Sequence, residues 1–332
     1  MRNNIATGDG ATMNWTMIVD LLDSPIFGKS PLGAFLRVNE AFLQRLPLRA
    51  RNSGLLRPYG EALHAVVGVR RNRTFNFGTL FMRNRPQLEL ALRLIDREEK
   101  VSSFTIAVLA CSIGAEVYSI LWTLCSRRPK IKFTVNAVDI SEEAIEFARN
   151  GVYSLAGSKF TGENIFSRLS KQEMDELFQA EAGKMRVHRR IRNNINWSTG
   201  DAADPKLAIQ LGPQDMVFAD NFLCHMNPAE AGRCLRNIVR LVRPDGYLFV
   251  SGVDLDVRSK VAHDLSLVPV KEMIDEIHEG DISLRKDWPF RYWGLEPLNK
   301  RRPDWQMRYC SVFRVVGGHS ADVLTEKARV VE

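Results

Sequence analysis

The sequence predicts an α/β fold built around a doubly wound parallel sheet. A continuous apolar and partly β-branched run at 104–110 is typical of a central strand buried on both faces. Strands and helices then alternate along the chain, as they do in an open parallel sheet. Acidic residues follow two of the strands, at the edge where such sheets bind their ligands. The chain has 332 residues, enough for roughly two domains.

The first half of the sheet follows from local signals. Pro86 suits the first turn of a helix, and Leu88, Leu92 and Ile95 continue it at helical spacing. Ser141 is a typical N-cap residue, and the helix that it starts ends near an Asn-Gly pair at 150–151. The predicted elements are a helix at 86–99, a strand at 104–110, a turn at 111–114, a helix at 115–126, a strand at 131–138 that ends at Asp139, and a helix at about 142–150.

A polar and basic segment at 152–193 interrupts this alternation, and we interpret it as an insertion beside the sheet with a helix at 170–181. The alternation then resumes. The predicted elements are strands at 195–199, 215–219 and 247–251, a helix at 228–242, a turn at 243–246, an apolar segment at 265–270, a charged helix at 270–279 and a terminal strand at 309–316. Residues 1–75 are expected to form a small, mainly helical N-terminal region.

Composition excludes several classes of protein. The five cysteines form no C-x-x-C pair, so neither a zinc site nor a disulfide framework is expected. The longest apolar run is far shorter than the roughly 20 residues of a spanning helix, and no secretory signal is recognised at the N-terminus. We therefore expect a cytoplasmic protein. The net charge of +7 is gathered in basic patches, but no nucleic-acid-binding motif accompanies them, so nucleic acid is not an expected partner.

Three acidic positions and one loop predict a site for an adenosine-containing ligand. Gly114 would let the backbone approach a ligand closely, and Glu116 would face a cation. Asp139 would accept hydrogen bonds from both hydroxyls of a ribose, and Asp201 would accept one from an adenine amino group. NAD and S-adenosyl-L-methionine (SAM) both remain open. SAM is favoured because the loop lacks G-x-G-x-x-G and is too poor in glycine to crowd a pyrophosphate.

A resemblance then becomes specific. The segments ACSIGAEVYS at 110–119, AVDIS at 137–141 and ARNGVY at 148–153 resemble, in order, motifs of the CheR-type chemotaxis-receptor methyltransferases. Further similar segments are NFGTLFMR at 76–83, LSKQE at 169–173, DMVFADNFLCHMN at 215–227 and LVRPDG at 241–246. The resemblance implies a seven-stranded, Rossmann-like class I methyltransferase sheet. It also implies a SAM-binding core at 76–253 with the insert 152–193, and a C-terminal extension at 254–332 that completes the sheet.

The resemblance also implies roles for individual residues. Glu116 would contact the methionine part of SAM, Asp139 the ribose, and Asp201 with Ala202 the adenine region. Thr79 and Arg83 would line the methyl-donor side, and being four residues apart they would share a face if this stretch is helical. The alternatives are a helix cap for Thr79 and a surface cation for Arg83. Asp220 and Asn221 would close the pocket. No metal is implied, and the cofactor is SAM.

Departures from the family pattern concern the methyl acceptor. The family has Arg where this chain has Asp220, and Tyr where it has His225, and the receptor-docking loop of some members is missing at 180–184. Arg83 would orient a carboxylate acceptor, and His225 would serve as a base for a hydroxyl acceptor or be structural. The first hypothesis is therefore O-methylation of a small-molecule carboxylate or hydroxyl. The alternatives are a protein-glutamate methyltransferase of chemotaxis-type signalling and a SAM-binding regulatory module without turnover.

Overall fold

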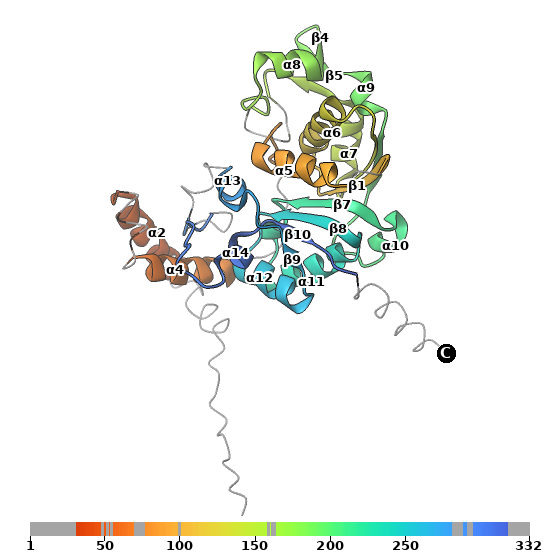
Figure 1. The fold of residues 1–332 in the computed structure, drawn as a ribbon. Helices are drawn as coiled ribbons and strands as arrows, with labels where there is room; N and C mark the ends of the chain where they lie inside the picture. The colour runs from red at the N-terminus through yellow and green to blue at the C-terminus, as the bar shows by residue number, and fades with distance from the viewer. Residues whose placement is uncertain are drawn as a thin grey trace, which may run out of the picture.

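The computed structural model describes residues 31–47, 50, 53, 56–69, 77–98, 101–157, 160, 164–280, 288–290 and 295–317. Its centre is a seven-stranded sheet with the strand order β6-β2-β1-β7-β8-β10-β9 (Figure 1). The strands are β1 (Ser103–Leu109), β2 (Lys132–Asp139), β6 (Ile195–Thr199), β7 (Gln214–Asp220), β8 (Val242–Ser251), β9 (Val268–Pro269) and β10 (Val312–Arg314). The strands from β6 to β8 pair in parallel, and β10 is antiparallel to both its neighbours. The predicted doubly wound, Rossmann-like sheet is confirmed.

Strand β1 is buried on both faces, which explains why its sequence is a continuous apolar run. Ile106 and Val108 belong to one core cluster, whereas Ala107 and Leu109 belong to the other. Helices α5 (Arg85–Asp96), α6 (Ala115–Arg127) and α7 (Glu142–Asn150) cover one face, and α11 (Pro228–Val239) and α12 (Leu255–Asp264) cover the other (Figure 1). The chain turns from one side of the sheet to the other between β1 and β7, so the ends of these strands form the switch point where ligands bind.

The helices begin where their capping residues predict. The Ser141 side chain accepts a hydrogen bond from the Ala144 N–H, and Gly151 ends α7 in the left-handed conformation. Asn84 accepts in the same way from the Gln87 N–H at the start of α5, and Asn227 caps α11. These caps fix the helix starts beside the strand ends.

The insert forms a small second sheet with the order β3-β5-β4. Its elements are β3 (Val152–Ser154), α8 (Lys171–Leu177), β4 (Phe178–Glu181), β5 (Lys184–Val187) and α9 (Arg189–Arg192). The helix predicted at 170–181 is wrong after Leu177. Ala182 and Gly183 both have positive φ and make the two-residue turn of a hairpin, so the residues before them pair as a strand.

The remaining elements differ from prediction mainly at their ends. Helix α11 stops at Val239, α13 (Ile274–Glu279) begins four residues late, and Tyr309 closes α14 (Trp305–Tyr309) rather than starting β10. Residues 243–246 lie within β8, where the register with β7 shifts, so the expected turn is a bulge. The described part of the N-terminal region contains α2 (Pro31–Gln44) and α4 (Arg57–Val69). The short helix α10 (Leu207–Leu211) follows β6. Residues 1–30 fall outside the described residues. None of the helices described here is long and apolar enough to cross a bilayer.

Candidate functional site

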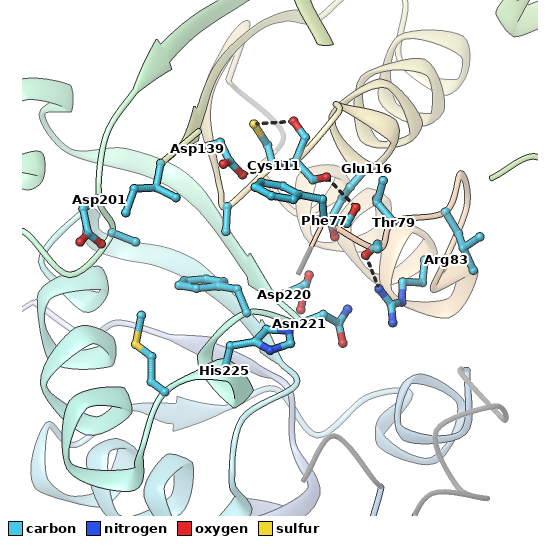
Figure 2. A pocket seen from close by; sticks show the side chains of 18 of the residues that line it. Phe77, Thr79, Arg83, Cys111, Glu116, Asp139, Asp201, Asp220, Asn221 and His225 are labelled. Carbon is cyan, nitrogen blue, oxygen red and sulfur yellow. Dashed lines mark hydrogen bonds between the residues drawn. The ribbon is translucent and has the colours of Figure 1, made fainter. Parts of the chain in front are cut away.

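A cavity opens at the carboxyl ends of β1, β2 and β7, the switch point of the sheet. It is lined by all of the predicted site residues except Gly114: Thr79, Arg83, Glu116, Asp139, Asp201, Ala202, Asp220, Asn221 and His225. Figure 2 shows Asp139 and Asp201 toward one end of this cavity and Arg83 at the other, with Asp220, Asn221 and His225 between them.

Asp139 is held by the backbone on both carboxylate oxygens. Its Oδ2 accepts from the Ser112 N–H at 2.7 Å and its Oδ1 from the Ser141 N–H at 2.9 Å. Burial raises the pKa of Asp139, while the N–H groups of Ser141, Ser112 and Ile140 oppose that rise. Each oxygen keeps lone-pair capacity for a further donor. Ser141 caps the following helix, so the Asp139 carboxylate is not the N-cap of that helix.

Asp201 and Ala202 lie at the same end of the cavity, just beyond the end of β6 at Thr199. The Asp201 Oδ1 accepts from the Ala203 N–H at 2.9 Å, which fixes the turn. Ala202 is buried beneath it. The Asp201 carboxylate therefore lies in a local turn that follows the end of β6.

Glu116 and Asp220 form a pair of acids near the middle of the cavity. Burial raises the pKa of Glu116 well above its ordinary value, the charge of Asp220 raises it further, and Arg83 opposes the shift. Burial also raises the pKa of Asp220, against hydrogen bonds with Ser251, Gln87 and Glu116. Among the described residues the Asp220 Oδ1 atom has no hydrogen-bond partner. A buried acceptor of this kind calls for a donor or a cation in the cavity.

Arg83 and Thr79 both line the cavity, although they do not lie on a helix. Residues 77–80 are irregular, 81–84 form a turn, and Met82 has a φ of 53°. The expected shared helix face is therefore wrong. The fully buried Phe81 anchors this segment, and the Arg83 Nη1 donates to the Gly78 carbonyl at 3.4 Å. The two side chains reach the cavity from the irregular stretch and the turn that precede α5.

Gly114 does not line the cavity, so the expectation that it admits a ligand is corrected. It starts α6 with a φ of 85°, and an added Cβ would lie 2.9 Å from the Trp197 ring and 3.0 Å from the Ala148 Cβ. The glycine is needed because α6 packs closely against its neighbours.

Sequence reasoning missed the apolar and backbone part of the lining. The missed residues are Phe77, Gly78, Leu80, Ala110, Cys111, Ser112, Ile140, Gly200, Phe222 and Met226. Most lie one or two positions from a predicted residue, and Ser112 ties the segments together because its hydroxyl donates to the Phe77 carbonyl at 2.8 Å. In the sequence, some of these residues could have been recognised because they are next to Asp139 or Asn221.

The model of the CheR methyltransferase SAM-binding domain matches residues 78–269 of this chain. The chain belongs to the CheR methyltransferase family. This confirms the resemblance, and with it a SAM-dependent methyltransferase domain whose cofactor is SAM. The acid-lined cavity fits that cofactor, because SAM carries an ammonium and a sulfonium and the Asp220 Oδ1 is a buried acceptor that has no partner among the residues the structure describes.

Curated relatives of this chain are also named methyltransferases. The probable biofilm formation methyltransferase WspC of Pseudomonas aeruginosa is 30% identical over 156 residues, covering 47% of this chain and 35% of that protein. The chemotaxis protein methyltransferase of Salmonella typhimurium is 30% identical over 146 residues, covering 42% and 48%. The chain thus spans about a third to a half of the length of these relatives. Among solved structures, magnesium protoporphyrin IX methyltransferase from Synechocystis with bound SAM covers 81% of this chain and 90% of its own at 15% identity and a TM-score of 0.32, too weak a likeness to bear on function.

The CheR match has a clear boundary in the structure. It begins at residue 78, after α4, and ends at residue 269, at the end of β9. Helix α4 and the segment 274–311 therefore lie outside the matched domain, whereas the whole cavity lining except Phe77 lies inside it.

Proposed function

We propose that this chain transfers the methyl group of SAM to a carboxylate and so forms a methyl ester. The observation that carries this proposal is the place of Arg83. It is a cation at the end of the SAM cavity opposite Asp139, and it also lines a second cavity next to the first. An anionic acceptor that enters from the second cavity would meet a guanidinium able to hold it by two parallel hydrogen bonds.

The residues would divide the work as follows. When bound, SAM supplies a methyl group on a cationic sulfur. Asp139, already fixed by two N–H groups, would take the ribose hydroxyls, and Glu116 with Asp220 would face the ammonium. Arg83 would align the acceptor, which is the main requirement of an in-line displacement. A carboxylate is ionised at neutral pH, so the chain need not supply a base.

The relatives support a protein as the acceptor. One is named a chemotaxis protein methyltransferase, and a protein carboxylate is the acceptor that the CheR resemblance implies. This support reaches only the matched region, which holds the SAM cavity.

A small acid is the second candidate, and a specific observation favours it. The family resemblance implies Arg at the position of Asp220 and Tyr at that of His225, so by that resemblance this chain differs from the family where the acceptor would meet the methyl group. Both residues line the cavity. A changed lining at that position favours a changed acceptor.

Methyl transfer from tritiated SAM tests the proposal directly. Purified protein is incubated with extracts separated into protein and small-molecule fractions, and the labelled product is then treated with base. A methyl ester releases volatile labelled methanol, whereas a methyl ether does not. Volatile label in either fraction supports carboxylate methylation, and base-stable label contradicts it. SAM binding without any label would support the regulatory module instead.

A further inference from the structure

The second cavity has a volume of about 210 Å³ and shares Arg83 and Asn221 with the SAM cavity. Its walls also include residues 251–256, and further side chains come from distant parts of the chain. Glu61 and His64 belong to α4, Arg258 to α12 and His278 to α13, and Trp288, Glu296 and Arg308 to the segment 288–311. Helices α4 and α13 and the segment 288–311 lie outside the CheR match, which ends at residue 269, whereas Arg258 and the lining residues between 83 and 256 lie inside it. The second cavity is therefore built partly from residues that the family comparison does not cover.

Arg258 is an arginine buried without a carboxylate. It is 3% exposed and lines the second cavity. Its Nη1 donates to the Val250 carbonyl at 3.1 Å and to the Ser311 Oγ at 3.2 Å, and its Nη2 donates to the Arg308 carbonyl at 2.8 Å. All three acceptors are neutral. Within the described residues it makes no ion pair, and its Nε–H has no partner.

The physical state of this guanidinium favours an anion beside it. Burial lowers the pKa of Arg258 to about 10, with the nearby Arg308 adding to that effect. A buried charge is costly unless it is paired. An oxyanion in the cavity would supply the missing charge and accept the Nε–H.

Trp288 offers a second donor of the same kind. It is 6% exposed and lines the cavity, and in the described part of the chain its indole Nε1–H has no partner. Gly60 on α4 makes room for the ring, because an added Cβ there would lie 2.4 Å from the Trp288 Cη2. Two N–H groups on buried side chains that line this cavity, the Arg258 Nε–H and the Trp288 Nε1–H, thus have no acceptor within the described part of the chain.

The acids that line the cavity are already engaged. Glu296 accepts from Arg57 at 2.9 Å, Arg308 at 2.6 Å and Tyr309 at 2.6 Å. Glu61 pairs with Arg57, and Asp254 caps α12 by accepting from two N–H groups. These carboxylates already have protein partners. Acceptor oxygens for the Arg258 Nε–H and the Trp288 Nε1–H would therefore have to come from a bound ligand.

We propose that the second cavity is the acceptor chamber and that it takes a small dicarboxylic acid. One carboxylate would lie at Arg83, beside the methyl donor, and the other would accept from Arg258 and Trp288. This inference rests on the proposed carboxylate methylation. A small acid is favoured over a protein side chain because both donors are more than nine-tenths buried and the volume suits a small molecule.

The transfer step balances without a co-reactant. A carboxylate oxygen donates an electron pair to the methyl carbon, and the carbon–sulfur bond breaks with its pair on sulfur. The products are a neutral methyl ester at that end and S-adenosylhomocysteine, and no proton moves. The second carboxylate stays ionised and keeps its hold on Arg258.

Calorimetric titration of the full chain, saturated with S-adenosylhomocysteine, tests the chamber with succinate, glutarate and adipate. At least one is expected to bind, and Trp288→Phe, which removes only the indole N–H donor and some ring area, should weaken that binding about tenfold. Trp122→Phe is the matched control, because the Trp122 Nε1 is also buried without a partner in the described residues but lines a different cavity. Gly60→Ala should weaken binding as well, since it displaces the indole.

The outcomes separate the chamber from the reaction. Binding that weakens in Trp288→Phe and not in Trp122→Phe supports the chamber. Binding of these acids without methyl transfer to any acceptor would keep the chamber and remove the proposed function. Ester formation on a protein fraction, with no binding of the three acids, would overturn the chamber and leave carboxylate methylation intact.

Discussion

The side-chain amide of Gln87 donates a hydrogen bond to the carboxylate of Asp220, with 2.6 Å between Nε2 and Oδ2. Gln87 lies in the first turn of α5 and Asp220 at the end of β7, and both are buried. The bond therefore joins α5 to the acid at the end of β7. It also lowers the pKa of Asp220, against the raising effect of burial.

Replacing Gln87 by Leu should weaken SAM binding about tenfold at pH 7. Without its donor, Asp220 holds a proton to higher pH and carries less negative charge toward a cationic ligand, and a hydrogen bond to a charged group is worth about 1.5–3 kcal/mol. The defect should shrink at pH 9, where the carboxylate is ionised in both proteins. Titration calorimetry at the two pH values measures this, with the exposed Gln172→Leu as control. A pH-independent defect would contradict the electrostatic reason.

Replacing Asp139 by Ala should weaken SAM binding at least 100-fold. Each ribose hydroxyl would lose a bond to a charged acceptor, at about 1.5–3 kcal/mol each. Ser112 and Ser141 would also lose the carboxylate that orders their N–H groups. Asp175→Ala, at an exposed position of α8, is the control for removing a carboxylate elsewhere. An unchanged dissociation constant for Asp139→Ala would refute the proposed ribose contact.

Arg83 should matter for the acceptor more than for SAM. Arg83→Gln is expected to lower kcat/KM for the acceptor about 100-fold. Arg83→Lys should lower it about tenfold, because Lys keeps the charge but loses the planar fork. The dissociation constant for SAM should change less than about threefold in both, since the chain's other acids carry that binding. The exposed Arg189→Gln serves as control in the same assays. Equal losses of kcat/KM in Arg83→Gln and Arg83→Lys would argue against a bidentate contact between Arg83 and the acceptor.

His225 separates a carboxylate acceptor from a hydroxyl. A carboxylate needs no base, so His225→Tyr, which restores the family residue, should keep kcat within about threefold, and His225→Phe should lose about tenfold through the missing polar atom. The methyl-transfer rate of the unaltered protein should not decrease when the pH is lowered through about 6.5, the range in which an ordinary imidazole takes up a proton. An inactive Phe variant, together with such a fall in the unaltered protein, would assign His225 as a base for a hydroxyl.

Glu296 should carry a pH-dependent part of the folding stability. Burial alone would raise its pKa, but hydrogen bonds and charge from Arg308, with Tyr309 and Arg57, hold the pKa of Glu296 below its ordinary 4.5. Its contribution is therefore complete above pH 4.5 and is lost as the pH falls through the lowered value. Glu296→Gln should cost about 3–5 kcal/mol in denaturant unfolding at pH 7, because it leaves Arg308 buried with less compensation. A cost that does not shrink in acid would contradict this assignment.

Much of the SAM cavity was predictable from the sequence because its residues follow strand ends, and parallel strands bring those ends together. Asp139 and Asp201 are predicted by that rule, Asp220 is placed only by the family resemblance, and the buried strand β1 is recognisable in the sequence as a continuous apolar run. The family assignment and the cofactor are confirmed on the same segments. The assigned roles of the individual site residues stay predictions.

Other features depend on contacts that no local pattern records. Gly114 was expected to meet a ligand, but the Trp197 and Ala148 side chains that require it come from elsewhere in the chain. The hairpin after Leu177 overrides a helical pattern because β5 pairs with it. The second cavity depends on pairs such as Arg57 and Glu296, which are 239 positions apart, so neither spacing nor composition indicates it.

Arg57 and Glu296 have a broader consequence for how such a protein diversifies. Their ion pair joins α4 to the residues that precede β10, and neither Arg57 nor Glu296 lines the SAM cavity. If the second cavity holds the acceptor as proposed, substitutions at this ion pair would change which acceptors bind and leave SAM binding unchanged. Acceptor selectivity could therefore change at the periphery of the domain, at a cost in folding stability, while the SAM site at its centre keeps the same residues.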